Sequence, residues 1–223
     1  MQQRKSKKIL IYFFLLFFVG SINNISLNNL SLNKINSIKV LGLGDKENLS
    51  LLEKIENLNL NNIFSIDVKR IKREIELNSL IEKYYIFKKY PSSISINIEK
   101  TKFLAKINKG GEIFFVGSNG KLTKADFYKD QLPFIFGNPE IDDFLSLKII
   151  IDQSKISYGD IKNLYFFPSK RWDLELRNNT VIKLSDKNIK ETLSLALKFL
   201  HSDELKDAKM IDARIKNQII LND

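Results

Sequence analysis

The chain has 223 residues, with 36 lysine or arginine and 26 aspartate or glutamate residues, which give a formal net charge of +10 at pH 7. It has no cysteine, which excludes a disulfide framework, zinc–thiolate sites, iron–sulfur clusters and cysteine nucleophiles. The positive charge is spread along the chain and comes mostly from lysine, a poorer reader of base edges than arginine, so we expect no nucleic-acid partner.

The N-terminus combines a basic cluster at 4–8 with an apolar run at 9–22. Short positively charged segments stay in the cytoplasm, so the sequence predicts a cytoplasmic tail over 1–8 and a transmembrane anchor over 9–27. The rest of the chain would then be periplasmic, in a single-pass type II protein of the cell inner membrane. The prediction assigns the anchor to Ile9, Phe13, Phe14, Leu16, Phe17 and Val19.

A cleaved signal peptide is the alternative interpretation of this segment. It explains the charged start, the apolar run and the small residues Gly20 and Ser21. The apolar run from 9 to 22 also falls short of a hydrocarbon core of about 30 Å at a rise of about 1.5 Å per residue. No A-x-A-like cleavage site follows it, however, and the apolar periodicity continues past residue 23. We therefore favour the uncleaved anchor.

A stem over 28–36 precedes a segment that alternates between strand and helix patterns. The predicted elements are a strand over 38–42, helices over 49–55 and 68–77, and strands over 81–88 and 94–99. The second helix starts after Asp67 or Ser65, either of which can cap it. The predicted order is β-α-α-β-β.

From about residue 102 the pattern becomes rich in hairpins, and the predicted fold class of the whole chain is α+β. Strands are predicted over 103–107, 113–116, 161–167, 172–176, 181–184 and 210–221, and helices over 144–153 and 188–200. The Asn119-Gly120 pair suits a tight hairpin turn.

The sequence contains no convincing catalytic, cofactor or metal motif. Its one histidine, His201, follows a helix and is interpreted as a surface residue, and the acidic pair Asp142 and Asp143 is interpreted as a helix cap. Gly42-Leu43-Gly44 lacks the third glycine of a dinucleotide-binding loop. We therefore predict a protein that is not an enzyme, with no cofactor and no small-molecule substrate.

Four short stretches carry a resemblance to a known family. They are Val40-Leu41-Gly42, Asn62-Ile63-Phe64-Ser65-Ile66-Asp67, the stretch from Lys88 through Pro91 to Glu99, and Asp212-Ala213-Arg214. In this order behind one N-terminal anchor, they resemble the FtsQ/DivIB family of bacterial cell-division proteins. The chain departs from the family pattern in lacking the glycine before Asn62-Ile63-Phe64 and the proline after Glu99.

The resemblance implies an FtsQ-type POTRA domain over 37–101 and a β-rich FtsQ-type domain over 102–223. It further implies a scaffold that links early and late division proteins at the septum, with the partners FtsB and FtsL. The alternatives are a POTRA-type chaperone or envelope-assembly module, and a secreted enzyme with an unrecognised site.

The predicted last strand suggests a mechanism, because a strand at an open sheet edge can pair with a strand of another chain. The resemblance implies that a segment of FtsB, itself in a coiled coil with FtsL, docks at this edge. The residues expected to bind it are Asp212, Arg214, Lys216, Gln218, Ile219, Ile220 and Leu221. Arg214 and Lys216 would attract acidic residues of the partner.

Overall fold

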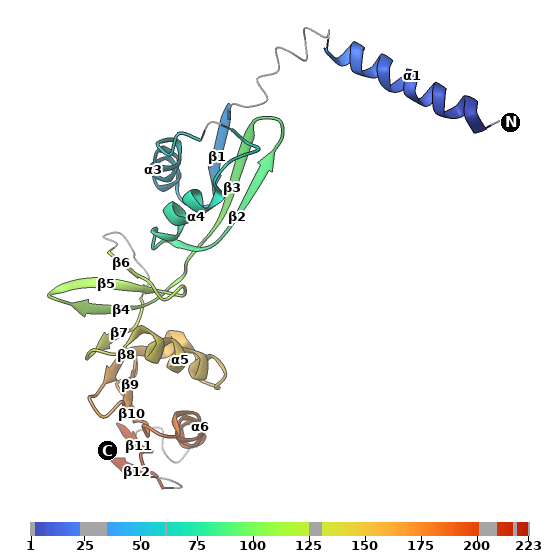
Figure 1. Cartoon of the computed structure of the whole chain (residues 1–223). Coiled ribbons are helices and arrows are strands. Elements are labelled where there is room, and N and C mark those ends of the chain that lie inside the picture. The colour runs from blue at the N-terminus through green and yellow to red at the C-terminus, as the bar shows by residue number, and fades with distance from the viewer. Residues whose placement is uncertain are drawn as a thin grey trace. The chain divides into compact units, whose positions relative to one another are not determined.

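The computed structural model describes residues 3–22, 35–60, 62–124, 131–200, 209–215 and 218–222 (Figure 1). The chain divides into two compact units, one made of Met1–Ile75 and Tyr84–Asn97, the other of Glu76–Lys83 and Ile98–Asp223. The fold is mixed α+β and rich in strands, as predicted.

Helix α1 (Gln3–Ile22) begins inside the predicted cytoplasmic tail and contains the apolar run. The side chains expected to form the anchor are exposed, among them Phe13 at 68% and Leu16 at 75%. No helix within the described residues is both long and apolar enough to cross a membrane. The predicted anchor over 9–27 begins within α1 and extends beyond its last residue, and it stays a prediction. Residues 23–27 lie outside the described residues.

The first unit has the predicted β-α-α-β-β order. Its elements are β1 (Ser37–Leu41), α3 (Asp45–Glu56), α4 (Val68–Glu76), β2 (Ile81–Lys89) and β3 (Ser93–Lys100), with sheet order β1-β3-β2 and β1 parallel to β3. The Asp67 carboxylate accepts a hydrogen bond from the Lys69 backbone N–H at 3.0 Å, which confirms the predicted cap of α4. Buried aliphatic side chains from both helices and the sheet form the core, namely Val40, Leu51, Ile55, Ile71, Ile75, Ile94 and Ile96.

The second unit is built on one nine-stranded sheet. Its elements are β4 (Phe103–Lys109), β5 (Glu112–Gly117), β6 (Leu122–Thr123), β7 (Phe134–Phe136), α5 (Ile141–Asp152), a 3₁₀ turn η1 (Tyr158–Asp160), β8 (Ile161–Phe166), β9 (Trp172–Leu176), β10 (Val181–Lys183), α6 (Ile189–Leu200), β11 (Met210–Asp212) and β12 (Ile220–Asn222). The strand order is β12-β11-β10-β9-β8-β7-β4-β5-β6. In the part of the chain that the structure describes, β12 and β6 are therefore the two edges.

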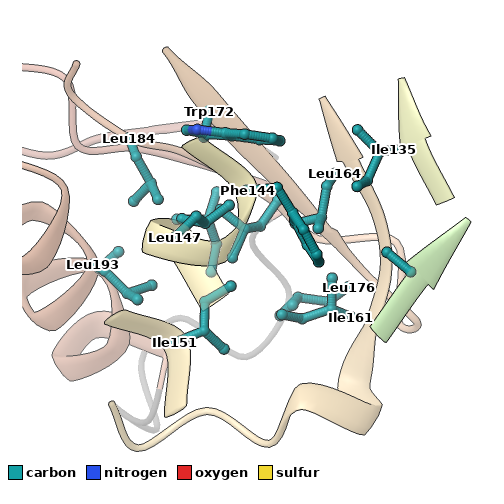
Figure 2. Packing of buried hydrophobic residues seen from close by; sticks show 14 of the residues in the cluster. Ile135, Phe144, Leu147, Ile151, Ile161, Leu164, Trp172, Leu176, Leu184 and Leu193 are labelled. Atoms are coloured by element: carbon teal, nitrogen blue, oxygen red, sulfur yellow. The ribbon is translucent and has the colours of Figure 1, made fainter. Parts of the chain in front are cut away.

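One face of this sheet carries the core (Figure 2). A row of apolar residues in register crosses the strands, from Ile135 through Leu164, Leu174 and Ile182 to Ile211. These five side chains are at most 1% exposed. The buried sides of α5 and α6 complete the cluster, with Phe144, Leu147, Ile151, Leu193, Ala196 and Leu197. Both helices therefore pack against the same face of the sheet.

Gly137 ends β7 in a backbone conformation that favours glycine. Its φ is +93°, and a Cβ atom built there would lie 2.2 Å from the Phe166 backbone oxygen on the neighbouring strand β8. Gly110, at φ +63° in the β4–β5 turn, has open space around the corresponding position. We expect Gly110→Ala to lower the free energy of unfolding by about 1 kcal/mol from backbone strain alone. Gly137→Ala should lower the free energy of unfolding by about 1 kcal/mol more than Gly110→Ala, because the Phe166 backbone oxygen is held in the sheet and cannot move away from the added methyl group.

Urea denaturation of the two variants measures this difference. Equal midpoints for the two variants would show that the contact with β8 does not constrain Gly137.

Candidate functional site

The candidate functional site is the C-terminal edge of the nine-stranded sheet. Strand β12 pairs antiparallel with β11, and β11 pairs parallel with β10. Within the described ranges no strand pairs with the other side of β12. That side therefore presents backbone N–H and C=O groups that another strand can use.

The sequence predicted one strand over 210–221, and the structure corrects this to the hairpin-like pair β11 and β12. The first strand ends at Asp212 because its carboxylate accepts a hydrogen bond from the Arg214 backbone N–H at 3.1 Å, a local turn that competes with the sheet. Further on, the Gln218 N–H donates to the Ile215 backbone oxygen at 3.2 Å. The chain therefore turns back and adds β12 beside β11.

The edge strand has one face toward the core and one face away from it. Leu221 is in register with the buried Ile211, and both Leu221 and Ile219 pack partly against the core. Ile220 is in register with Asp212 on the opposite face and is 51% exposed. Gln218 is also exposed, whereas Lys216 lies outside the described residues. Of the predicted binding residues, Ile220 and Gln218 are thus the most accessible described side chains on this edge.

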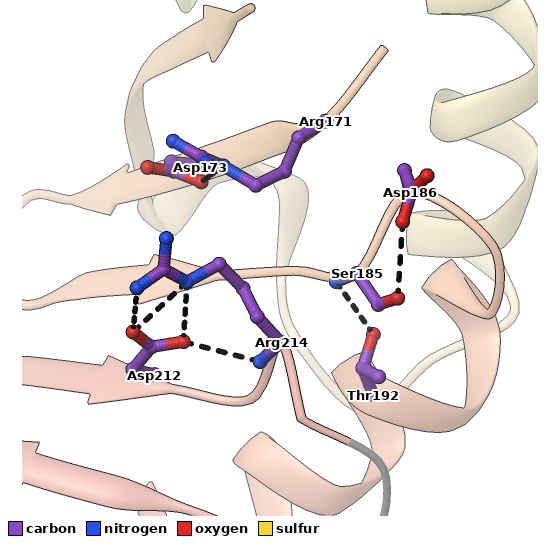
Figure 3. A network of polar contacts seen from close by, with 7 residues as sticks. All are labelled: Arg171, Asp173, Ser185, Asp186, Thr192, Asp212 and Arg214. Carbon is purple, nitrogen blue, oxygen red and sulfur yellow. Dashed lines mark hydrogen bonds and ion pairs between the residues drawn. The ribbon is translucent and has the colours of Figure 1, made fainter. Parts of the chain in front are cut away.

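A row of charged side chains leads across the sheet to Ile220. Asp173 on β9 is in register with Lys183 on β10, and Lys183 with Asp212 on β11. Arg171 and Arg214 flank the two carboxylates (Figure 3). Cations and carboxylates alternate from strand to strand, an arrangement that favours this pairing of strands.

Arg214 is bound within the chain by Asp212. Its Nε lies 2.8 and 2.9 Å from the two carboxylate oxygens, and the Asp212 side chain is 6% exposed while that of Arg214 is 43% exposed. The hydrogen bond from Arg214 lowers the pKa of Asp212, and the same contact raises the pKa of Arg214. The predicted attraction of Arg214 to a partner's acidic residues is therefore already partly satisfied by Asp212.

Asp173 has the opposite pKa shift. Burial raises its pKa, while the Arg171 guanidinium, with Nε 3.1 Å from the carboxylate, opposes the rise. Lys183 and Arg214 also act on Asp173 electrostatically. The surrounding cations therefore act to lower the pKa values of both carboxylates.

A second cluster of polar side chains, on the same face as Asp173, connects β8 and β9. The Glu175 carboxylate accepts hydrogen bonds from the Tyr165 hydroxyl at 2.6 Å and the Asn163 amide at 2.8 Å. Together with Lys162 these bonds lower the pKa of Glu175 to about 2, and the bond to Glu175 raises the pKa of Tyr165. Tyr165 also stacks on Phe136, with ring centroids 5.0 Å apart. These contacts connect side chains of β7, β8 and β9 on this face of the sheet.

Sequence reasoning missed Asp173 and Lys183 as neighbours of the edge. Each is a polar residue that alternates with apolar residues in its strand, and this alternation predicts that it faces away from the core. The alternation does not predict that Asp173 and Lys183 lie opposite each other, because that depends on the register between the two strands. Among the residues with described positions, no group of three or more His, Cys, Asp or Glu side chains could hold a metal ion. The predicted capping role of Asp142 and Asp143 is wrong, because both lie inside the first turn of α5 and Glu140 occupies its N-cap position. His201 lies outside the described residues.

Comparison with known proteins gives two adjacent matches to family models. One is described as a POTRA domain, FtsQ-type, and matches residues 33–100; the other is described as cell division protein FtsQ/DivIB, C-terminal, and matches residues 105–214. Strand β12 lies beyond the second matched range.

Individual relatives are similar over much of the chain. Cell division protein DivIB of Bacillus subtilis is 32% identical over 136 residues, which are 58% of this chain and 50% of that protein. Cell division protein FtsQ of Rickettsia bellii is 21% identical over 200 residues, 82% of this chain and 70% of that protein. The chain spans about half the length of the first two curated relatives that it matches.

Among solved structures, the chain is similar to the major extracytoplasmic domain of the cell division protein DivIB from Geobacillus stearothermophilus. The identity is 14%, the match covers 42% of this chain and 86% of that one, and the TM-score is 0.32.

Proposed function

The chain belongs to the FtsQ/DivIB family of cell-division proteins, and we propose that it is a non-enzymatic scaffold of the division machinery whose edge strand β12 docks a strand of a partner. The observation that supports this proposal is the unpaired side of β12, with Ile220 exposed on the face away from the core. A partner strand would extend the nine-stranded sheet by one strand through main-chain hydrogen bonds.

We propose FtsB, paired with FtsL, as the partner at this edge. The support is the family resemblance together with the edge itself. The partner strand would meet Ile220 and Gln218 directly, and the charge row ending at Arg214 would orient it. Asp212 holds the Arg214 side chain in place. The N–H groups of Arg214 that do not bind Asp212 would therefore donate hydrogen bonds to the partner strand from a fixed position.

The cellular setting is part of the same proposal. We place the protein at the inner membrane, concentrated at the division septum, with the bulk of the chain periplasmic and the domains divided as 37–101 and 102–223. Attachment near the membrane would keep β12 among other membrane-attached division proteins and raise their effective concentration. The alternatives, an assembly chaperone and a secreted enzyme, have no observation in the described part of the chain that favours them.

Co-purification of the full chain with FtsB and FtsL from detergent-solubilised membranes tests the docking edge. Ile220→Glu should reduce capture of FtsB at least about tenfold, because a charge on the exposed face of the edge strand opposes strand addition. Ile219→Glu is unsuitable, since Ile219 packs partly against the core.

The matched control is Ile149→Glu, which makes the same substitution at a side chain of α5 that is 58% exposed. It should leave capture unchanged. Equal capture by the two variants would remove β12 as the docking site.

A further inference from the structure

Two aromatic side chains of the first unit lie exposed against each other. Phe64, in the loop before α4, and Tyr90, in the turn after β2, are 59% and 61% exposed. Their ring centroids are 5.3 Å apart, with 28° between the ring planes. The Phe64 backbone N–H donates to the Asn62 side-chain oxygen at 2.9 Å, a local bond that holds the loop. The pair is therefore a preformed apolar surface that does not belong to the core of the unit.

The exposed surface continues from Tyr90 along β2 with Lys89, Phe87 and Tyr85. These three residues alternate in the strand and therefore share one face. All three are exposed, Phe87 at 48% and Tyr85 at 50%. The strand thus adds two more aromatic rings and a cation to the surface that begins with the stacked pair.

The lysines beside the aromatic pair lie in a segment without acidic residues. Residues 84–97, which include Lys88 and Lys89, contain no aspartate or glutamate, and the chain has none before Asp45. The residues of this unit that the structure does not describe are not acidic either. The Asp67 carboxylate caps α4, and among the described residues no ion pair involves either lysine. Both charges are available to an anionic ligand.

The aromatic pair lies at the end of the unit where the chain arrives from α1. The Asn36 backbone N–H donates to the Ser92 backbone oxygen at 2.8 Å. From there β1 runs parallel to β3, so its start and the turn with Tyr90 lie at the same end of the three-stranded sheet (Figure 1). Residues 23–35 join α1 to this point, and a segment of that length reaches at most about 50 Å.

The side chains of α1 indicate what lies within that reach. From Ile9 to Val19 all of them are apolar or aromatic and between 54% and 75% exposed, so they need an apolar environment. In the proposed function that environment is the inner membrane. Aromatic rings with a polar group, such as tyrosine, concentrate at the level of lipid head groups, and lysine is attracted by anionic lipid. The surface around Tyr90 has both kinds of side chain.

We propose that Phe64 and Tyr90 insert into the head-group region of an anionic bilayer, with Lys88 and Lys89 bound to lipid phosphates. The contact rests on the membrane attachment in the proposed function and is independent of docking at β12. Its strength depends on the apolar area that enters the bilayer and on the attraction of the lysines to anionic lipid. With α1 and the aromatic pair as two attachment points, the first unit would keep one end at the membrane surface.

Fluorescence quenching in vesicles tests this contact. The full chain has no cysteine, so Ser65→Cys accepts a single environment-sensitive fluorophore beside Phe64. The labelled chain is reconstituted into vesicles of phosphatidylglycerol and phosphatidylcholine that contain a lipid with a nitroxide quencher near its head group. The reference is Asn97→Cys, because Asn97 is exposed and in register with Leu41, at the end of the sheet away from the turn. We expect quenching at least about threefold stronger for Ser65→Cys than for the reference.

The aromatic part of the contact is tested by adding Phe64→Ser and Tyr90→Ser to the labelled chain. Quenching should fall to the level of the reference position. The matched control is Leu41→Ser with Leu49→Ser, which removes two apolar side chains of the same unit that are 54% and 60% exposed. This control should leave the quenching unchanged.

The electrostatic part is tested in the same way with K88E/K89E. This variant should at least about halve the quenching, because the reversed charges are repelled by anionic lipid. The control K46E/K54E changes the net charge equally at two exposed lysines of α3 and should have no effect.

Flotation of the vesicles separates this contact from membrane attachment. A chain that floats with the vesicles but is quenched equally at the two labelled positions, or loses quenching equally in variants and controls, would overturn the contact alone. A chain that does not float would overturn the proposed membrane attachment and the contact with it. A fluorescence change in Ser65→Cys that requires FtsB and FtsL, and is absent with vesicles alone, would assign the aromatic pair to a protein partner and overturn the proposal.

Discussion

Replacing Phe144 with alanine is expected to lower the free energy of unfolding of the second unit by about 3–5 kcal/mol. Phe144 is 0% exposed and lies at the centre of the cluster that joins α5 to the sheet (Figure 2). Its removal takes away a large apolar surface and leaves a cavity that fixed neighbours on several strands cannot fill. Domains of this size are stable by about 5–15 kcal/mol, so the variant loses a large fraction of that margin.

The fluorescence of Trp172 during urea denaturation measures this loss. Trp172 is the one tryptophan of the chain, is 2% exposed and belongs to the same cluster. Ile149→Ala on the same helix is the control, because Ile149 is 58% exposed and should change stability by less than about 0.5 kcal/mol. Similar midpoints for the two variants would mean that α5 does not pack on the sheet through Phe144.

Local patterns in the sequence predicted the elements of the first unit well. The second helix of that unit is the clearest case, since Asp67 caps it and Ile71 and Ile75 are buried at helical spacing. Both signals act within one or two helical turns. The start of α3 was placed too late, at 49, because its first turn is polar and is held by hydrogen bonds between Asn48 and Leu43 at 3.1 Å.

Neighbours within the large sheet could not be predicted in the same way. Alternation indicates which residues of a strand share a face, but not which strand lies beside it. Strand β7 illustrates this limit, since it pairs in parallel with β4 on one side and with β8 on the other. These contacts join segments that are distant in the sequence, and no local signal specifies them.

At the candidate site, too, the sequence predicted the segment involved but not how that segment folds against the sheet. The sequence directed attention to residues 212–221, and the structure places β12 at an edge of the sheet. The single strand predicted over 210–221 was wrong because a turn follows Asp212. In the strand β12 that follows, Ile220 is exposed, whereas the preceding Ile219 packs partly against the core. The binding role of these residues remains a prediction.

Replacing Arg214 with alanine is expected to lower the free energy of unfolding by about 2–3 kcal/mol near neutral pH. The substitution removes the side-chain hydrogen bonds to Asp212, a carboxylate that is 6% exposed. It also removes a cation that stabilises the charged form of Asp173. Arg214 is itself 43% exposed, so water partly replaces it and the loss stays below that of a fully buried ion pair.

The pH dependence of this loss identifies its cause. The fold lowers the pKa of Asp212, chiefly through the hydrogen bond from Arg214, so the pair adds stability above the unfolded pKa of about 4. That stability is lost as the pH falls through the lowered pKa of the folded state. The difference in unfolding free energy between the wild-type chain and Arg214→Ala should therefore be full at pH 7 and shrink below about pH 4. A difference that stays constant down to pH 2 would assign the effect to lost packing of the arginine stem, and Arg214→Lys, which keeps a long aliphatic stem, should then be much less destabilised than the alanine variant.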